Sequence, residues 1–404
     1  MQRIMNQIQN KNIILGLTGS IAVYKSAELT RLLLDQGTQV QVVMTDAACR
    51  FITPATMQAL SGKPVLIELW QDNHATNQMD HINLGRTTNA ILIAPASADF
   101  IAKLAHGLAD DLLSTVCLAR DCPLIVAPAM NRKMWENPAM QRNLKQLETD
   151  GITILGPASG IQACGEEGMG RMLEPGELAD AVSSFFWPKL LSGIKILITA
   201  GPTYEQIDAV RGITNRSSGK MGYAVAKAAL ELGAEVTMIS GPTALLCPHG
   251  IALKNVTSAA EMFSAVQELV ADADIFIGVA AVADYRVAQP VEHKIKKSVS
   301  TLTLELIPNP DILGYVAGLP SPPFCVGFAA ESQNLREYAE TKRKAKNIQL
   351  IAANLVQEAI GADDNEMVLF DAVGETILPR ADKLTQARAL LQRIIQLYRQ
   401  GTQT

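Results

Sequence analysis

The segment NIILGLTGSIAVYKSAELTRLLLDQGTQVQVVMT, residues 12–45, decides the fold class of the chain. It contains a short apolar run that ends in glycine and serine, then an amphipathic segment, then a second apolar run. Parallel strands need a crossover connection, so this order predicts the strand–helix–strand unit of a parallel sheet. Three later apolar runs predict further buried strands, at residues 90–97, 123–130 and 152–157.

The same pattern begins again in the second half of the chain. Residues 194–203 predict a strand that ends in a glycine turn, 217–233 a loop that leads into a helix, and 234–242 the next strand. Later elements are expected at residues 274–285, 325–330 and 349–354 (strands) and 384–398 (a helix with one apolar stripe). We therefore expect an α/β protein with two consecutive doubly wound, Rossmann-like parallel-sheet domains, each with a ligand at the carboxyl ends of its strands.

A boundary between the two domains is expected near residue 190. The helical pattern before it runs into Trp187-Pro188, and Gly193 follows. Proline stops a helix because it lacks an N–H donor and clashes with the preceding turn. The predicted domains are residues 1–190 and 191–404.

Composition narrows the class of protein. Of the 404 residues, 48% are hydrophobic, and the net charge of −5 without a long run of lysine or arginine argues against a nucleic-acid groove. No apolar stretch approaches the roughly 18 residues of a membrane span, and the first ten residues lack the apolar core of a signal peptide. The six cysteines form no CxxC pair, which favours reduced thiols in a cytoplasmic protein. From the charge and the apolar pattern, no nucleic-acid or membrane partner is expected.

Small polar residues follow several strands of the first domain. Gly19 and Ser20 end the first strand, where a phosphate could bind the serine and the backbone N–H groups of the coming helix. Hydroxyl groups recur at Thr45, Thr53 and Ser97. Together they predict a polar pocket over the edge of the sheet, although each hydroxyl could instead cap a helix.

The stretch ACGEEGMGRM, residues 163–172, places Cys164 in a glycine-rich loop. Such a loop could bind a nucleotide, hold a metal or form a mobile lid. A metal ligand lacks partners at suitable spacing, and Gly19-Ser20 is the better phosphate cradle, so the pattern favours a lid that carries the thiol over bound substrate. His81 and Asn131 are polar residues that fit the same pocket.

Several motifs of the first half together resemble those of the homo-oligomeric flavin-containing cysteine decarboxylases: GSIAVYK, HINLGR, APAMN and ACGEEGMGRM. The second half carries AGPTYEQIDAVRGITNRSSGKMG, AAVADYR, KIKK, NPDIL and VGFAAES, and it resembles the phosphopantothenate–cysteine ligase family. In this order on one chain, the motifs resemble the bifunctional coenzyme A biosynthesis family over about residues 12 to 398.

The first resemblance implies a flavodoxin-like flavoprotein domain that decarboxylates a cysteinyl group with FMN, bound at Gly19, Ser20, Thr45, Thr53 and Ser97. It implies that oxidised FMN takes a hydride from the carbon beside sulfur. The resulting thioaldehyde accepts the electrons released as CO2 leaves, and the enethiol product then receives a proton and the returned hydride.

The same resemblance implies a role for five further residues. His81 would act at the substrate's thiol or carboxylate, Asn131 would bind the carboxylate, and Cys164 would deliver the proton to the enethiol. Arg171 and Met172 would help to hold the substrate.

The second resemblance implies a nucleotide-binding ligase domain that activates 4'-phosphopantothenate with CTP and Mg²⁺, as an acyl-cytidylate, and couples it to L-cysteine. Lys294 would neutralise charge as the cytidylate forms, Asn215 would act with the acyl-cytidylate, and Arg211 would hold the pantothenate end. The phosphate cradle and nucleotide positions are Ser217, Ser218, Gly219, Lys220, Gly278, Val279, Ala280, Asp284, Pro310, Asp311, Ile312, Leu313, Phe328, Lys342 and Lys346. The cradle is not a Walker A sequence, and no metal ligand is assigned.

One loop departs from the ligase pattern, since Gly212 and Thr214 stand where an aromatic residue and a serine are expected. Two other classes of protein fit less well. A non-catalytic flavoprotein is disfavoured because His81, Asn131 and Cys164 are all present, and a nicotinamide oxidoreductase because the first turn lacks GxGxxG. The family resemblance further implies a homo-oligomer, with decarboxylase trimers, up to a dodecamer, and ligase domains paired as dimers.

Overall fold

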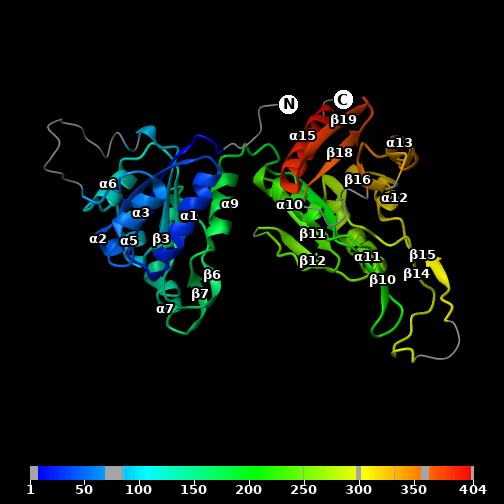
Figure 1. Ribbon diagram of the computed structural model, residues 1–404, viewed down its shortest axis with the longest axis horizontal. Coiled ribbons are helices and arrows are strands. Elements are labelled where there is room, and N and C mark those ends of the chain that lie inside the picture. The colour runs from blue at the N-terminus through cyan, green and yellow to red at the C-terminus, as the bar shows by residue number, and fades with distance from the viewer. Residues whose placement is uncertain are drawn as a thin grey trace. The chain divides into compact units, whose positions relative to one another are not determined.

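The computed structural model describes residues 8–68, 84, 86–248, 250–296, 302–331, 333–355 and 364–401 (Figure 1). It divides into two compact units, Met1–Phe186 and Trp187–Thr404. Each unit is built of helices and a mainly parallel sheet, which confirms the predicted α/β class. The division falls between Phe186 and Trp187, beside the helix stop at Pro188.

The first unit has a five-stranded parallel sheet in the order β2-β1-β3-β4-β5. Its strands are β1 (Asn12–Leu17), β2 (Gln39–Met44), β3 (Ala90–Ala96), β4 (Leu124–Pro128) and β5 (Thr153–Ile154). The central strand β1 pairs with β2 through Ile13↔Val40 and with β3 through Ile13↔Ala90. These are the strands that the apolar runs predicted.

Helices cover both faces of this sheet, so its strands are apolar on both sides. Ile13, Leu15 and Leu17 pack in one core with helices on one face, while Ile14 packs in the other. The first face carries α1 (Tyr24–Asp35), α3 (Pro54–Ser61) and α9 (Pro175–Phe185); the second carries α5 (Ala98–His106), α6 (Leu112–Leu118) and α8 (Pro138–Thr149). Shorter elements are η1 (Ile21–Val23), α2 (Asp46–Cys49), α7 (Arg132–Trp135) and the antiparallel hairpin β6 (Ala158–Ile161) and β7 (Glu167–Arg171).

The second unit has an eight-stranded sheet in the order β12-β11-β8-β13-β16-β17-β18-β19. Six parallel strands come first: β8 (Lys195–Ala200), β11 (Glu235–Ser240), β12 (Ala252–Asn255), β13 (Ile275–Gly278), β16 (Phe324–Glu331) and β17 (Leu350–Leu355). The last two, β18 (Asp364–Phe370) and β19 (Glu375–Asp382), are antiparallel and were not predicted. Antiparallel neighbours can be joined by a short turn without a crossover helix. The strand–helix–strand pattern that predicted the other strands therefore does not detect this pair.

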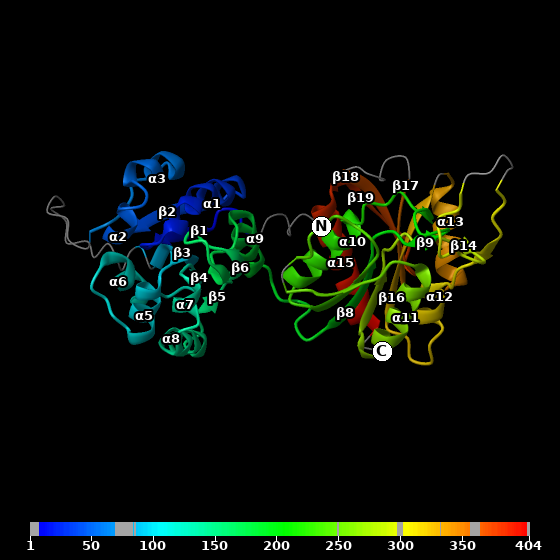
Figure 2. The ribbon, with the colours of Figure 1, turned by 90° about the horizontal axis from the view of Figure 1, so that it is seen from below.

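The helices of the second unit are α10 (Lys220–Glu231), η2 (Val270–Asp272), α11 (Ala259–Leu269), α12 (Ile312–Ala317), α13 (Leu335–Ala345) and α15 (Lys383–Gly401). Two small antiparallel pairs lie outside the main sheet, β9 (Tyr204–Gln206) with β10 (Gly212–Thr214) and β14 (Tyr285–Val287) with β15 (Leu306–Pro308). The predicted C-terminal helix is present as α15, which lies against α10 (Figure 2). Ala387, Leu391 and Ile394 of its apolar stripe are buried.

Within the described ranges, no helix combines the length and the hydrophobicity that crossing a bilayer requires.

A buried ion pair fixes α15 on α10. Glu231 is 4% exposed and accepts from Nε and Nη2 of Arg388, both at 2.8 Å. The guanidinium also stacks over Trp187, 4.7 Å from the ring centroid. The pair therefore ties the first residue of the second unit to its C-terminal helix.

We predict that Arg388→Leu lowers the free energy of unfolding of the second unit by about 3 kcal/mol, because it leaves the buried Glu231 carboxylate without its partner. Hydrogen exchange of the buried β8 amides would measure the loss. The matched control is Arg336→Leu, which breaks an exposed pair with Glu375 and should change stability by less than about 1 kcal/mol. Equal effects of the two substitutions would contradict this account.

Candidate active sites

A pocket of about 810 Å³ lies at the carboxyl ends of β1, β2 and β3 in the first unit. Parallel pairing brings these ends together, so the residues that follow each strand line one cavity. The lining includes Thr18, Gly19, Thr45, Asp46, Ala47, Ile67, Glu68, Ser97, Ala98, Asp99, Phe100, Lys103, Asp110, Asp111, Leu112 and Met134. A side chain at Gly19 would place its Cβ 2.6 Å from Cβ of Ala47, so this turn requires glycine.

The predicted hydroxyl residues divide into two groups. Thr45 and Ser97 line the pocket, together with Gly19. Ser20 and Thr53 are not among its lining residues: Ser20 caps η1 and donates to Ala129 O at 3.4 Å, and Thr53 caps α3. Thr45 and Ser97 also cap the helices that follow them, so the capping alternative holds for all four hydroxyls.

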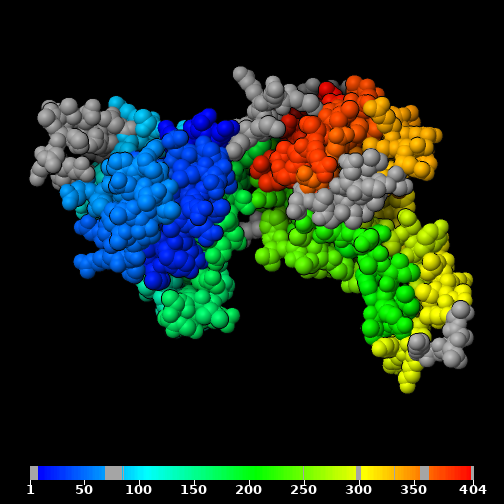
Figure 3. All heavy atoms as spheres, in the orientation of Figure 1, coloured from blue at the N-terminus to red at the C-terminus, as the bar shows by residue number. Residues whose placement is uncertain are grey.

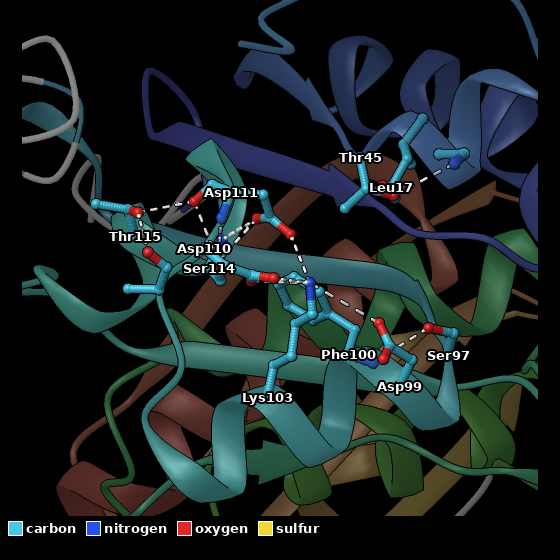
Figure 4. A network of polar contacts seen from close by, with 12 residues as sticks. Leu17, Thr45, Ser97, Asp99, Phe100, Lys103, Asp110, Asp111, Ser114 and Thr115 are labelled. Carbon is cyan, nitrogen blue, oxygen red and sulfur yellow. Dashed lines mark hydrogen bonds and ion pairs between the residues drawn. The ribbon is translucent and has the colours of Figure 1, made fainter. Parts of the chain in front are cut away.

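A network of charges on one wall of the pocket was not predicted from the sequence (Figure 4). Lys103 Nζ lies 2.8 Å from Asp110, 3.2 Å from Asp111 and 4.0 Å from Asp99. The hydrogen bond to Asp110 raises the pKa of Lys103, although burial opposes this, and the same bond lowers the pKa of Asp110. The wall therefore stays ionised and hydrogen-bonded.

Asn131 and Cys164, which are far apart in sequence, are brought into contact. Asn131 caps α7 through Oδ1, which accepts from Lys133 N at 2.8 Å. Its Nδ2 then faces the tip of the β6–β7 hairpin, 3.4 Å from Cys164 Sγ and 2.9 Å from Glu166 Oε2. All six cysteines lie in described residues, and Cys164 is the exposed one.

Glycines let the hairpin pack closely against the loop after β4. A Cβ at Gly170 would lie 2.3 Å from Met130 O, and one at Gly168 would lie 2.4 Å from Cδ of Arg132. Both residues have positive φ, 133° and 149°. The base of the hairpin is therefore fixed, while its tip with Cys164 stays exposed, as the predicted lid requires.

The last two residues of the motif, Arg171 and Met172, are held by contacts at the base of the hairpin. Arg171 is half-buried and donates to Glu174 at 3.0 Å, and Lys25 Nζ reaches the same carboxylate at 2.8 Å. Met172 has a side chain that is 1% exposed and packs in the core, and only its carbonyl meets Lys25. Burial of Met172 does not support a contact with substrate. His81 lies outside the described residues.

The glycine loops of the second unit meet where β8 and β11 end. Gly219 has φ 78° and precedes α10, and a Cβ there would lie 3.3 Å from Cα of Gly201. A Cβ at Gly241 would lie 1.8 Å from Pro202 O. Asn215 Nδ2 donates to Ala281 O at 2.8 Å, which joins the predicted cradle of Ser217, Ser218 and Lys220 to the loop that follows Gly278, Val279 and Ala280.

Arg211 is held by a residue that the sequence analysis did not single out. Its guanidinium donates to Asp208 Oδ2 at 2.6 Å and 3.0 Å, and to Ile295 O at 2.6 Å. Burial alone would raise the pKa of Asp208, but bonds from the N–H groups of Val210 and Ile295 and from Arg211 hold it far below its usual range. The bond from Arg211 to Ile295 places the neighbouring, exposed Lys294 beside the predicted substrate loop. In Figure 3 the segment around residue 211 (green) and the segment around residue 294 (yellow) project together from the second unit.

The two departures in that loop have a structural explanation. A Cβ at Gly212 would lie 2.3 Å from Cζ of Tyr204, so an aromatic ring from the facing strand β9 already fills this place. Thr214 Oγ1 donates to Thr203 O at 2.7 Å, a bond that serine could also make.

Residues predicted to bind the nucleotide gather into one charged cluster. Lys346 Nζ contacts both oxygens of Asp311, at 2.6 and 2.7 Å, and Lys342 donates to Phe328 O at 3.3 Å. Burial lowers the pKa of Lys342, and repulsion from Lys346 lowers it further. The carboxylate of Asp284 acts in the opposite direction. Burial would raise the pKa of Asp311, but Lys346 and the Gly314 N–H outweigh it. Pro310, Ile312 and Leu313 flank Asp311 at the start of α12.

Both units thus bring candidate site residues together at the carboxyl ends of parallel strands, the arrangement of cofactor- and nucleotide-binding enzymes. A family model described as Flavoprotein matches residues 2–186, and one described as DNA/pantothenate metabolism flavoprotein C-terminal domain (DFP) matches residues 191–398.

Known proteins resemble the whole chain. The coenzyme A biosynthesis bifunctional protein CoaBC of Vibrio cholerae is 50% identical over 396 residues, 96% of this chain and 99% of that protein. Its Escherichia coli counterpart is 46% identical over 399 residues, 97% of this chain and 98% of that protein. A crystal structure of the C-terminal domain of a CoaBC protein is 39% identical and covers 52% of this chain and 99% of its own, with a TM-score of 0.46.

The chain belongs to the family of coenzyme A biosynthesis bifunctional proteins CoaBC. It is an enzyme with a flavoprotein decarboxylase unit and a ligase unit.

We predict that Lys346→Met raises the pKa of both Asp311 and Lys342. The Lys346 cation favours the ionised carboxylate of Asp311 and disfavours the protonated ammonium of Lys342, so its removal shifts both upward. Carbon NMR titration of the carboxyl group, and of methylated lysines, would measure the two shifts. Lys344→Met is the control on the same helix, because Lys344 pairs with Glu340 instead. An unchanged pKa of Asp311 in Lys346→Met would rule out the assigned coupling.

Proposed function

We propose that residues 1–190 form an FMN-dependent phosphopantothenoylcysteine decarboxylase and residues 191–404 a CTP-dependent phosphopantothenate–cysteine ligase. The ligase couples 4'-phosphopantothenate to L-cysteine, and the decarboxylase converts the product into 4'-phosphopantetheine. The observation that carries the first assignment is the contact between Asn131 and the exposed thiol of Cys164.

The first pocket suits FMN in size and chemistry. Its volume of about 810 Å³ lies in the range of cofactor sites, and the Gly19 turn leaves no room for a side chain. The three aspartates around Lys103 repel phosphate, which favours the glycine turn at Gly19 as the place where the phosphate binds. The flavin supplies a two-electron oxidation and the return of the electrons.

The residues of this unit bind the substrate and move protons. Asn131 Nδ2 points away from its own helix and can donate to the substrate carboxylate. Cys164, at the exposed tip of the hairpin, can give its proton to the enethiol formed after CO2 leaves. His81 acts at the substrate's thiol or carboxylate, and Arg171 holds the substrate near the base of the hairpin.

In the ligase unit, the 217–220 loop and the 278–280 loop cradle the phosphates of CTP. Gly219 packs closely on Gly201, and Asn215 links the first loop to Ala281, just after the second. Lys342 and Lys346 offset the negative charge of the nucleotide, and Lys294 does so as the cytidylate forms. Arg211, which Asp208 orients, holds the pantothenate end. Mg²⁺ would enter this site with CTP, whose phosphate oxygens are ligands that suit it.

Assembly of the decarboxylase units into trimers, with pairing of the ligase units, is part of the proposal. Large apolar side chains are exposed on the segments of the first unit that follow β1 and β2, among them Ile21, Tyr24 and Phe51 at 58%, 64% and 52%. Burial of these side chains against another copy of the chain would favour association.

The complete function predicts one product. The full-length holoenzyme, given 4'-phosphopantothenate, L-cysteine and CTP with Mg²⁺, should yield 4'-phosphopantetheine, CO2, CMP and pyrophosphate, as mass spectrometry would detect. Accumulation of phosphopantothenoylcysteine alone would remove the decarboxylase half of the proposal. Failure to form it would remove the ligase half.

A second prediction concerns the thiol. Cys164→Ser should bind FMN and release CO2, but it should stall at an oxidised intermediate because the serine hydroxyl is a far weaker acid than a thiol. Mass spectrometry should detect a species two mass units below phosphopantetheine. The control is Cys247→Ser, which changes a half-buried cysteine of the other unit. This variant should turn over normally. Loss of CO2 release in Cys164→Ser would mean that the thiol acts earlier.

A further inference from the structure

The amide that is proposed to bind the substrate carboxylate already binds a carboxylate of the chain. Glu166 Oε2 accepts from Asn131 Nδ2 at 2.9 Å, the shortest of the contacts of this nitrogen. Gln162 Oε1 and Cys164 Sγ lie farther from it, at 3.3 and 3.4 Å. Two N–H groups thus face three acceptors, of which Glu166 alone is charged and therefore forms the strongest bond.

The orientation of the amide is determined by the backbone. Asn131 Oδ1 accepts from Lys133 N at 2.8 Å as the cap of α7, so Nδ2 is directed toward the hairpin tip. This nitrogen is a donor only. Whatever binds it must be an acceptor, and a carboxylate fits best.

Glu166 can leave this position without disturbing the fold. The base of the hairpin is held by the bond from Met130 N to Gly170 O at 3.0 Å and by the close packing of Gly168 against Arg132. Glu166 itself is exposed, and it follows Gly165, where φ is 85° and an added Cβ would meet no described heavy atom within 4 Å. The tip therefore has space and a flexible joint beside the glutamate.

We propose that Glu166 is a specificity-determining residue of the decarboxylase unit: its carboxylate occupies the position on Asn131 Nδ2 that the substrate carboxylate takes on binding. This inference rests on the proposed function. Two carboxylates bound side by side on one amide nitrogen repel each other, so substrate displaces Glu166. Once CO2 has left, Glu166 returns to Asn131. The exchange lowers the affinity for the carboxylated substrate and leaves that for the decarboxylated product unchanged.

The test compares two unreactive ligands that differ only in the carboxylate. Phosphopantothenoylserine carries it, and phosphopantothenoylethanolamine lacks it; with oxygen in place of sulfur, neither can be converted to a thioaldehyde. Calorimetry on the FMN-loaded full chain would give the affinity of each for the wild type, Glu166→Ala and Glu166→Gln. The control is Glu167→Ala, a change in the neighbouring exposed glutamate.

Glu166→Ala should bind the serine ligand about fivefold more tightly, the size of one exchanged hydrogen bond, and the ethanolamine ligand as the wild type does. Glu166→Gln should fall between, since a neutral amide is a weaker acceptor, and Glu167→Ala should match the wild type. Weaker binding of the serine ligand by Glu166→Ala, or an equal change for both ligands, would overturn the inference. If the wild type binds neither ligand, the proposed substrate is wrong and the inference falls with it.

Discussion

Parallel strand pairing is the constraint on which both active sites depend. Because β1, β2 and β3 run in the same direction, the residues that follow them lie at one edge of the sheet, although residues 45 and 97 are far apart in sequence. The same geometry brings the loop after β8 to the loop after β13, where Asn215 reaches Ala281. Buried apolar strands with helices on both faces keep these edges rigid, and the chemistry can then be placed on short loops.

The charged groups near these edges are ionised because they are paired. Lys103 is surrounded by three aspartates in the first unit, and Asp208 accepts five hydrogen bonds in the second. In each case hydrogen bonds to the charged form outweigh the effect of burial. Such networks position neighbouring groups. The one around Asp208 joins Arg211 to the segment of Lys294, and the ion pair of Lys346 with Asp311 joins the end of α13 to the start of α12.

Much of this could be predicted from the sequence, and the exceptions have identifiable causes. The spacing of apolar residues and the glycine turns predicted the strands. Apolar spacing reflects burial, and glycine reflects the backbone freedom that a turn needs. The pair β18 and β19 was missed because an antiparallel hairpin at a sheet edge lacks the crossover pattern. Ser20 and Thr53 were placed in the pocket, but they cap helices outside its lining, because a hydroxyl after a strand serves either purpose. Lys103, Asp208 and Glu166 were missed because an isolated charge carries no local signal of its partner.

The sequence by itself determined the two α/β units, the glycine turns at Gly19 and Gly219, and the motifs that connect the chain to its family. These are local properties, since hydrophobic period and the absence of a side chain act within a few residues. Only the tertiary structure decided that Asn131 meets Cys164 and Glu166, that Tyr204 fills the space at Gly212, and that Met172 is buried. Those contacts join residues that are distant in the chain, and their distances follow from sheet register and packing.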